Sequence, residues 1–231
     1  MLARSGPLPT GSGWRFEPKL DGFHCLTCTH GGRLRVRSRR GWDMTKLLPE
    51  LGELPADVQL DGELIAWGAD GNPDFHRLGR RMLQGDRSIA VTYMAFDVLG
   101  LDGEPTLRLP YAERHALLEE IVLDAPPTLV EVVASFEDGP ALGDVIVERR
   151  MQGVVAKRER EPCRPGTRSW VSAHAQAAPS FQFPARPGAE ARHPVPREPR
   201  RAEPRSAPAP PDDRGAFERA YSGRSHEGND R

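Results

Sequence analysis

Alternation of apolar and polar residues, the pattern of half-buried β-strands, recurs along the chain from its start to Val171. The alternating runs are rich in branched and aromatic residues, and Gly, Asn, Asp or Pro separates them, as in strands that are joined by tight turns. These runs predict strands over residues 14–19, 23–29, 33–39, 58–67, 89–99, 129–136 and 153–157.

Segments with the helical period are fewer. Pro110 precedes a stretch with an apolar stripe (Leu117, Leu118, Ile121 and Val122), which predicts a helix over 111–123. Further helices are predicted over 43–51, 74–82 and 138–150. Because strands outnumber helices and hairpin signals are frequent, the sequence predicts an α+β fold with mainly antiparallel sheets and flanking helices.

The pattern changes after Val171. From 172 to 231 prolines recur every few residues among alanine, arginine, glycine and serine, and neither the strand period nor the helical period persists. Such a segment cannot bury enough apolar surface to offset its ordering entropy. We therefore expect one ordered domain over 1–171 and a disordered Pro/Arg/Ala-rich tail over 172–231.

The composition, with 38% hydrophobic and 28% charged residues, is that of a soluble protein, and no apolar stretch is long enough to span a bilayer. The formal net charge of −1 gives no overall basic signature, so a nucleic acid would have to be bound by a local patch. Neither a second pair nor a nearby histidine completes a site with Cys25-x-x-Cys28, which favours reduced, structural cysteines over a zinc or redox site. We expect a cytoplasmic monomer that contacts no membrane.

Lysine is scarce, and Lys19, Lys46 and Lys157 are the only three in the chain. An amine can lose its proton and attack an electrophile, whereas a guanidinium group effectively cannot. Lys19 stands where an apolar run ends, beside Asp21 and Gly22. Lys19 is therefore the candidate nucleophile.

Two predicted strands carry charge on one face. Arginine alternates strictly from Arg33 to Arg39, which indicates either a solvated face or contacts with phosphate groups. Asp61 and Glu63 share one face of the strand over 58–67. Carboxylates placed in this way suit a cation or a ribose hydroxyl, and the alternative is an exposed acidic face.

Six short runs occur in order along the chain. They are Glu17-Pro18-Lys19-Leu20-Asp21-Gly22, Ser38-Arg39-Arg40-Gly41, Asp61-Gly62-Glu63-Leu64, Phe96-Asp97-Val98-Leu99, Gly153-Val154-Val155-Ala156-Lys157 and Arg164-Pro165-Gly166-Thr167-Arg168-Ser169-x-Val171. In this order and spacing they resemble the nucleotidyltransferase (adenylation) domain of ATP-dependent DNA ligases, especially the small bacterial type. The resemblance covers residues 1–171 and implies an ATP-grasp-like ligase fold with a nucleotide-binding cleft.

The resemblance also implies a reaction. Lys19 attacks the α-phosphate of ATP and expels pyrophosphate, the resulting lysyl-AMP passes AMP to the 5′-phosphate of a nick, and the 3′-hydroxyl then seals the strand. The lysine must be neutral to attack, so we expect burial and neighbouring cations to lower its pKa. Mg²⁺ or Mn²⁺ would offset phosphate charge. Nicked DNA is the implied partner, with DNA-repair proteins as further partners.

The resemblance assigns a role to each further site residue. Glu17 and its neighbours read the adenine, Phe96 stacks on it, and Lys157 meets the α-phosphate. Arg39 and Glu63 hold the ribose or the metal, with Glu63 as the metal ligand. The complete set of implied nucleotide-binding residues is Glu17, Asp21, Gly22, His24, Arg39, Glu63, Phe96 and Lys157.

Five positions depart from the family pattern. His24 replaces an arginine, Gln152 an acidic residue and Cys163 an aromatic one, and Ser172 and His174 stand where two lysines are expected. The tail cannot supply the five-stranded OB-fold that follows in the family. Two alternatives therefore stay open: an ATP-binding remnant that no longer turns over, and an RNA ligase or capping-type nucleotidyltransferase.

Overall fold

The computed structural model describes residues 3–54, 57–123 and 129–175. The tail predicted over 172–231 lies outside the described residues from position 176 onward. Within the described ranges no helix combines the length and the apolar character that crossing a membrane requires.

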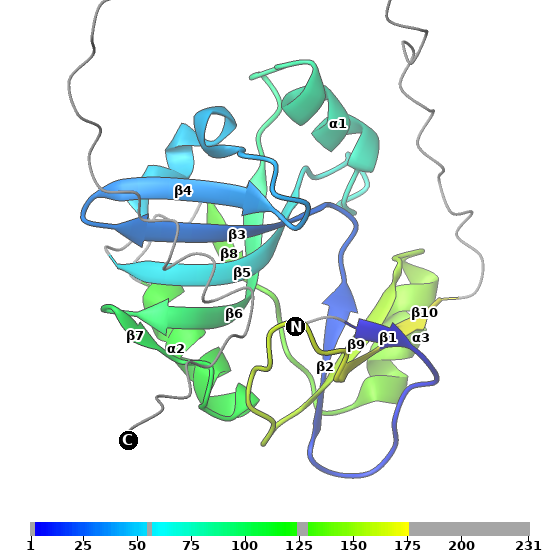
Figure 1. The fold of residues 1–231 in the computed structure, drawn as a ribbon. Helices are drawn as coiled ribbons and strands as arrows, with labels where there is room; N and C mark the ends of the chain where they lie inside the picture. Colours follow the sequence, from blue (N-terminus) through cyan, green and yellow to red (C-terminus); the bar gives the residue numbers. More distant parts are fainter. Residues whose placement is uncertain (1–2, 55–56, 124–128, 176–231) are drawn as a thin grey trace, which may run out of the picture.

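Residues from both ends of the described chain form a four-stranded sheet, sheet A (Figure 1). Its strand order is β1 (Ala3–Ser5), β10 (Trp170–His174), β9 (Gly153–Arg158) and β2 (Trp14–Lys19). β1 runs parallel to β10, and the other pairs are antiparallel. One face of sheet A packs against α3 (Gly139–Glu148) around a small apolar core of Phe16, Leu142, Ile146, Val154, Ala156 and Val171.

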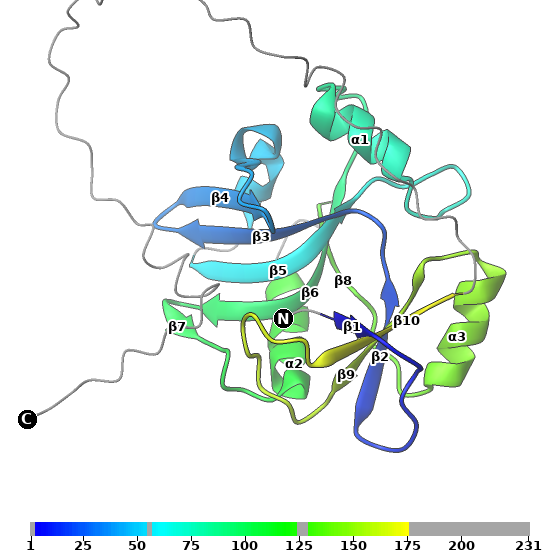
Figure 2. The same ribbon diagram turned by 45° about the vertical axis from the view of Figure 1, so that its right-hand side comes forward.

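The second sheet, sheet B, is larger. Its order is β4 (Arg33–Ser38), β3 (Phe23–His30), β5 (Val58–Ile65), β6 (Thr92–Leu101) and β7 (Glu104–Pro105), all antiparallel. β8 (Val130–Val132) adds to β6 in parallel. The elements beside this sheet are α1 (Phe75–Leu83), α2 (Tyr111–Leu123) and the 3₁₀ helices η1 (Thr45–Leu47) and η2 (Pro49–Glu53) (Figure 2).

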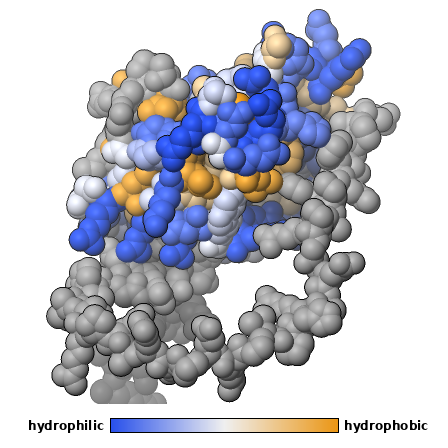
Figure 3. Space-filling view, turned by 90° about the horizontal axis from the view of Figure 1, so that it is seen from above, coloured by the Kyte–Doolittle hydropathy of each residue, from blue (hydrophilic) through white to orange (hydrophobic). Residues whose placement is uncertain are grey.

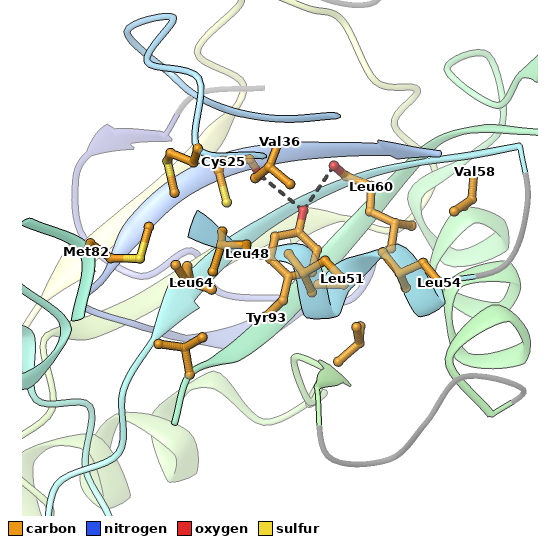
Figure 4. Close-up of a cluster of buried hydrophobic side chains, with 14 of the residues drawn as sticks. Cys25, Val36, Leu48, Leu51, Leu54, Val58, Leu60, Leu64, Met82 and Tyr93 are labelled. Carbon is orange, nitrogen blue, oxygen red and sulfur yellow. Dashed lines mark hydrogen bonds between the residues drawn. The ribbon is translucent and has the colours of Figure 1, made fainter. Parts of the chain in front are cut away.

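The largest apolar core lies on one face of sheet B (Figure 4). Tyr93 is fully buried in it, and its hydroxyl lies 3.1 Å from the Cys25 carbonyl oxygen and 3.0 Å from that of Leu60. A Cβ on Gly62 would lie 2.6 Å from Cζ of the Tyr93 ring, so the ring fits only because position 62 is glycine. The core thus fixes how β3, β5 and β6 lie against one another.

A buried ion pair attaches α2 to sheet B. Arg114 binds both carboxylate oxygens of Asp97, through Nε at 2.6 Å and Nη2 at 2.9 Å, and neither side chain is exposed. The same guanidinium donates from Nη1 to the Leu109 carbonyl oxygen at 2.6 Å. This two-pronged geometry orients α2 against the strand that carries Phe96.

Helix α1 packs against the apolar core of sheet B and lies at the top of the molecule in Figure 1. Asp74 caps its N-terminus, because the carboxylate accepts a hydrogen bond from the Arg77 amide at 2.9 Å. Leu78 and Met82 are buried, whereas Arg77 and Arg80 are exposed. Seen from above, this end of the molecule is mostly hydrophilic, with smaller hydrophobic areas between the polar side chains (Figure 3).

The predicted α+β fold with mainly antiparallel sheets and flanking helices is confirmed. The helix predicted over 43–51 is wrong: η1 and η2 occupy this stretch, because Pro49 has no amide proton and breaks a continuous helix. Several strand boundaries also differ from the predicted ones. β5 ends at Ile65 rather than at 67, β6 begins at Thr92 rather than at 89, and β8 spans three residues of the predicted 129–136.

β10 continues beyond Val171, the predicted end of the ordered domain. Ser172, Ala173 and His174 pair with Val155, Val154 and Gly153 of β9, and Ser172 is buried. The sequence did not predict this strand, because Ser172 and His174 interrupt the apolar signal and the partner strands β1 and β9 are remote in sequence.

The extent of β10 can be tested by truncation. A chain ending at Val171 lacks three residues of β10, whereas a chain ending at Ala175 retains them. The lost ladder hydrogen bonds should lower the melting temperature of the shorter chain by about 5–10 °C relative to the longer one. Circular dichroism melts of both chains measure this, and equal melting temperatures would contradict the role given to Ser172–His174.

Candidate functional site

The face of sheet A opposite α3 carries the predicted nucleophile. Side chains alternate between the two faces of a strand. Phe16 and Ala156 pack against α3, so Glu17, Lys19 and Lys157 project from the other face, toward sheet B.

The matching face of sheet B carries the remaining predicted residues. Cys25 and Leu64 lie in the main core, so His24, Asp61 and Glu63 project from the opposite face. His24 and Glu63 are direct neighbours, because they are paired in the register of β3 and β5.

Contacts join the two faces. The Lys157 amine donates to the Phe96 carbonyl oxygen at 3.0 Å, and the Trp170 ring meets the Phe96 ring edge-on at a centroid distance of 5.8 Å. The Glu63 carboxylate acts electrostatically on the Lys19 amine. The structure therefore brings together residues from β2, β3, β5, β6, β9 and β10, which are far apart in sequence.

Lys19 ends β2 and is half-buried. Burial lowers the pKa of its amine, and the Glu63 and Asp21 carboxylates offset part of this effect. The expectation that neighbouring cations lower this pKa is wrong, because the charged neighbours that act on it are carboxylates. The amine donates to Oε1 of Gln152, whose Nε2 donates to Asp21 Oδ1 at 3.2 Å.

Gly22 allows the chain to turn from sheet A into sheet B close to Lys19. A Cβ at this position would lie 2.2 Å from the Leu64 carbonyl oxygen and 2.9 Å from Cγ2 of Ile65. Backbone cannot move aside as a flexible side chain can, so only glycine permits this approach. The approach brings Lys19 near the β5 segment that carries Glu63.

Glu63 is half-buried, and burial raises the pKa of its carboxyl to about 7, with His24 and Lys19 acting in the opposite direction. Among the described residues no group of three or more His, Cys, Asp or Glu side chains could hold a metal ion. Mg²⁺, however, keeps several waters and binds through one or two carboxylates together with substrate phosphates. Glu63 fits that mode of binding and does not fit a cage made of protein ligands alone.

His24 takes the position of the family's arginine and pairs with Asp61, its Nε2 lying 2.5 Å from Oδ1. Burial alone would lower the pKa of the imidazole, but the Asp61 carboxylate outweighs it and raises the pKa. Burial likewise raises the pKa of Asp61, and His24 outweighs it and lowers that pKa. The centroid of the imidazole ring lies 5.7 Å from that of the Phe96 ring, so the His24–Asp61 pair borders the aromatic group.

Lys157 is enclosed. Its side chain is 1% exposed, and Nζ lies 2.7 Å from Oε2 of Glu17. The same amine lies 4.2 Å from the ring centroid of Trp170, 4.9 Å from that of Phe96 and 5.0 Å from that of Tyr111. Glu17 is buried as well and accepts a hydrogen bond from the Tyr111 hydroxyl at 2.5 Å.

The remaining predicted residues lie at the solvent-exposed edge of the space between the two sheets. Arg39 and Asp21 are exposed, and the Arg39 amide donates to the His24 carbonyl oxygen at 3.2 Å. Two residues of the site were missed by the sequence interpretation, Tyr111 and Trp170. Neither carries a local signal, because Tyr111 is the first residue of a predicted helix and Trp170 is the unspecified position of the motif that ends at Val171.

The structure also shows where the residues that depart from the family pattern lie. Ser172 lies on the same face of β10 as Trp170, and its hydroxyl is buried without a partner among the described residues. His174 is exposed at the end of β10. Cys163 packs with Leu26 and Leu99, and burial raises the pKa of its thiol to about 11.

Comparison with known proteins agrees with this arrangement. A family model described as ATP dependent DNA ligase domain matches residues 8–172. The chain is 34% identical over 180 residues to the multifunctional non-homologous end joining protein LigD of Mycolicibacterium smegmatis, covering 74% of this chain and 23% of LigD. It is 28% identical over 155 residues to the SPbeta prophage-derived DNA ligase-like protein LigB of Bacillus subtilis, covering 66% of this chain and 57% of LigB.

Solved structures give the same result. A mycobacterial DNA ligase D complexed with ATP and MES superposes with a TM-score of 0.66 at 33% identity, covering 75% of this chain and 58% of that one. The ligase domain of M. tuberculosis LigD gives a TM-score of 0.65 at 33% identity, covering 74% of this chain and 57% of that one. The chain thus spans about a quarter of the LigD proteins and over half of these ligase domains. It belongs to the family of ATP-dependent DNA ligase domains.

Proposed function

We propose that this chain catalyses the adenylation step of DNA ligation. The Lys19 nitrogen attacks the α-phosphorus of ATP, the bond to the β-phosphate oxygen breaks, and pyrophosphate leaves, so that AMP remains on the lysine. The observation that carries this proposal is the half-buried Lys19 amine with a lowered pKa, placed between the two sheets beside Glu63. A lower pKa leaves more of the amine neutral and able to attack at a given pH.

The residues around Lys19 would hold the nucleotide. Phe96 is half-buried and offers a ring for stacking on the base, while Glu17 offers a buried acceptor for a base amino group. The exposed Arg39 would supply positive charge for ribose or phosphate oxygens, and His24 would do so when its imidazole, whose pKa the Asp61 carboxylate raises, is protonated. Glu63 would hold Mg²⁺ or Mn²⁺, and the bound ion would neutralise charge on the phosphates.

The proposed context is the repair of DNA. AMP would pass to a 5′-phosphate at a nick, and attack by the 3′-hydroxyl would release it. Similarity to LigD supports end joining as the setting. Because the match covers only 23% of LigD, the complete ligation reaction needs a test of its own. The described residues support nucleotide capture more directly than strand sealing, because Gln152 and Ser172 replace charged groups that the family pattern expects.

Lys19 is tested by covalent labelling. Wild-type protein incubated with α-labelled ATP and Mg²⁺ should carry label that survives denaturation, and Lys19→Ala should carry none, because the phosphoramide bond needs that nitrogen. Lys46→Ala is the matched control: Lys46 is an exposed lysine in η1, so its loss should change labelling by less than about twofold.

The same assay separates the alternatives. A folded wild type that takes no label contradicts the proposal and supports an ATP-binding remnant, whereas preferential labelling by GTP supports a capping-type enzyme. Labelled protein is then mixed with nicked duplex DNA, and sealed product measures the later steps independently of the first.

Substitution of Gln152 tests what determines the pKa of the Lys19 amine. Gln152→Glu places a carboxylate where a neutral amide now accepts the lysine's hydrogen bond. An added negative charge favours the protonated amine, so the pKa of Lys19 should rise and the pH dependence of labelling should move upward by about one unit. This shift is measured from the initial rates of labelling in a series of buffers from about pH 5.5 to about pH 9.

Gln152→Ala is the control for this shift, because it removes the same hydrogen bond without adding charge. Its pH profile should therefore not move upward. An identical upward shift in both variants would show that the hydrogen bond, rather than the charge at position 152, sets the pKa of Lys19.

A further inference from the structure

The buried amine of Lys157 already has several partners among the described residues. It forms the ion pair with Glu17 at 2.7 Å and donates to the Phe96 carbonyl oxygen at 3.0 Å. The face of the Trp170 ring lies 4.2 Å away. An ammonium group has three N–H donors, and these contacts account for all of them.

A direct contact with a phosphate would require Lys157 to leave this arrangement. The Glu17 carboxylate, 3% exposed, would then remain buried without its cation, which is strongly unfavourable. The structure therefore argues against the α-phosphate contact that the family resemblance implies for Lys157.

The partner that Lys157 orients is Glu17. Lys157 holds one carboxylate oxygen, Oε2, and the Tyr111 hydroxyl holds the other, Oε1, at 2.5 Å. Burial and the neighbouring Glu17 raise the pKa of Tyr111, so its hydroxyl stays protonated and remains a donor. Glu17 is thus fixed in direction beside the Phe96 ring that is proposed to stack on the base.

A fixed carboxylate discriminates between purine bases. It accepts a hydrogen bond from an amino group, such as that at position 6 of adenine, and it repels the carbonyl oxygen that guanine carries at the same position. A site whose polar group is left unpaired by the wrong ligand rejects that ligand strongly.

We propose that Lys157 and Tyr111 are positioning residues that hold Glu17 as the reader of the base amino group, so that they set the preference for adenine over guanine without touching the phosphates. The inference rests on the proposed function, since it assumes that the base lies at Glu17 and Phe96.

Binding of nucleosides tests this assignment, because adenosine and guanosine carry the base but no phosphate. Their dissociation constants are measured by calorimetry for the wild-type chain, Lys157→Met and Tyr111→Phe. We expect both variants to bind adenosine about tenfold more weakly, because a charge-assisted partner of Glu17 is lost, while guanosine binding changes little. Labelling by ATP should show a raised KM with kcat changed by less than about threefold.

A phosphate contact by Lys157 gives the opposite result. Adenosine affinity in Lys157→Met would then equal that of the wild type and kcat for labelling would fall, and this outcome overturns the inference. Equal affinity of the wild-type chain for adenosine and guanosine would also overturn the inference. If Lys157→Met fails to fold, as judged by circular dichroism, Tyr111→Phe decides alone, because it deletes a single oxygen and keeps the ring.

A double-mutant cycle separates positioning from a general loss of structure. In a Glu17→Gln background, Tyr111→Phe should have less than about a third of its effect on adenosine affinity, because both residues act through the same carboxylate. Additive effects would overturn the inference. A wild type that binds adenosine but takes no label from ATP would refute the proposed function and leave the nucleoside comparison to decide this inference.

Discussion

The ion pair between Lys157 and Glu17 is the contact on which the arrangement of the site depends. It lies where β2 and β9 of sheet A meet β6 of sheet B and the start of α2, because its partners include the Phe96 carbonyl oxygen and the Tyr111 hydroxyl. Burying two charges is costly, and hydrogen bonds to the remaining lone pairs and protons offset that cost. Removing either charge would cost about 3–5 kcal/mol. The hydrogen bonds that the pair makes to the Phe96 carbonyl oxygen and the Tyr111 hydroxyl connect sheet A to sheet B and to α2, and so fix the spacing of the two sheets here.

The position of Lys19 follows from this fixed spacing. The residue ends β2 two positions after Glu17, so it projects from the same face of sheet A. Gly22 then lets the chain pass close to the backbone of β5, which places Glu63 within electrostatic reach of the amine. The resulting half-burial lowers the pKa of the amine, so the lowered pKa on which the proposed role of Lys19 depends arises from the packing of two sheets rather than from a dedicated cationic neighbour.

The sequence predicted those features that have local causes. Alternation and turn residues indicated most strands, and the scarcity of lysine singled out Lys19. It did not predict what long-range packing decides. The end of β10 depends on pairing with β1 and β9, and the enclosure of Lys157 depends on rings from three separate elements. The place of Tyr111 in the site depends on long-range contacts that orient α2, among them the Asp97–Arg114 ion pair and the hydrogen bond from the Tyr111 amide to the Glu161 carbonyl oxygen, and no pattern within α2 predicts them.

Three of the five departures from the family pattern, Gln152, Ser172 and His174, lie close together along β9 and β10 of sheet A. His174 pairs with Gly153, the residue after Gln152, and the Ala175 amide donates to the Gln152 carbonyl oxygen at 3.2 Å. Relative to the family pattern, this region loses one negative charge at Gln152 and two positive charges at Ser172 and His174. The loss of the carboxylate favours a neutral Lys19, and the loss of the lysines leaves less positive charge for the phosphates. Under the proposed function, capture of the nucleotide would therefore depend more on recognition of the base, and the protein itself would give the transition state for phosphoryl transfer less electrostatic stabilisation.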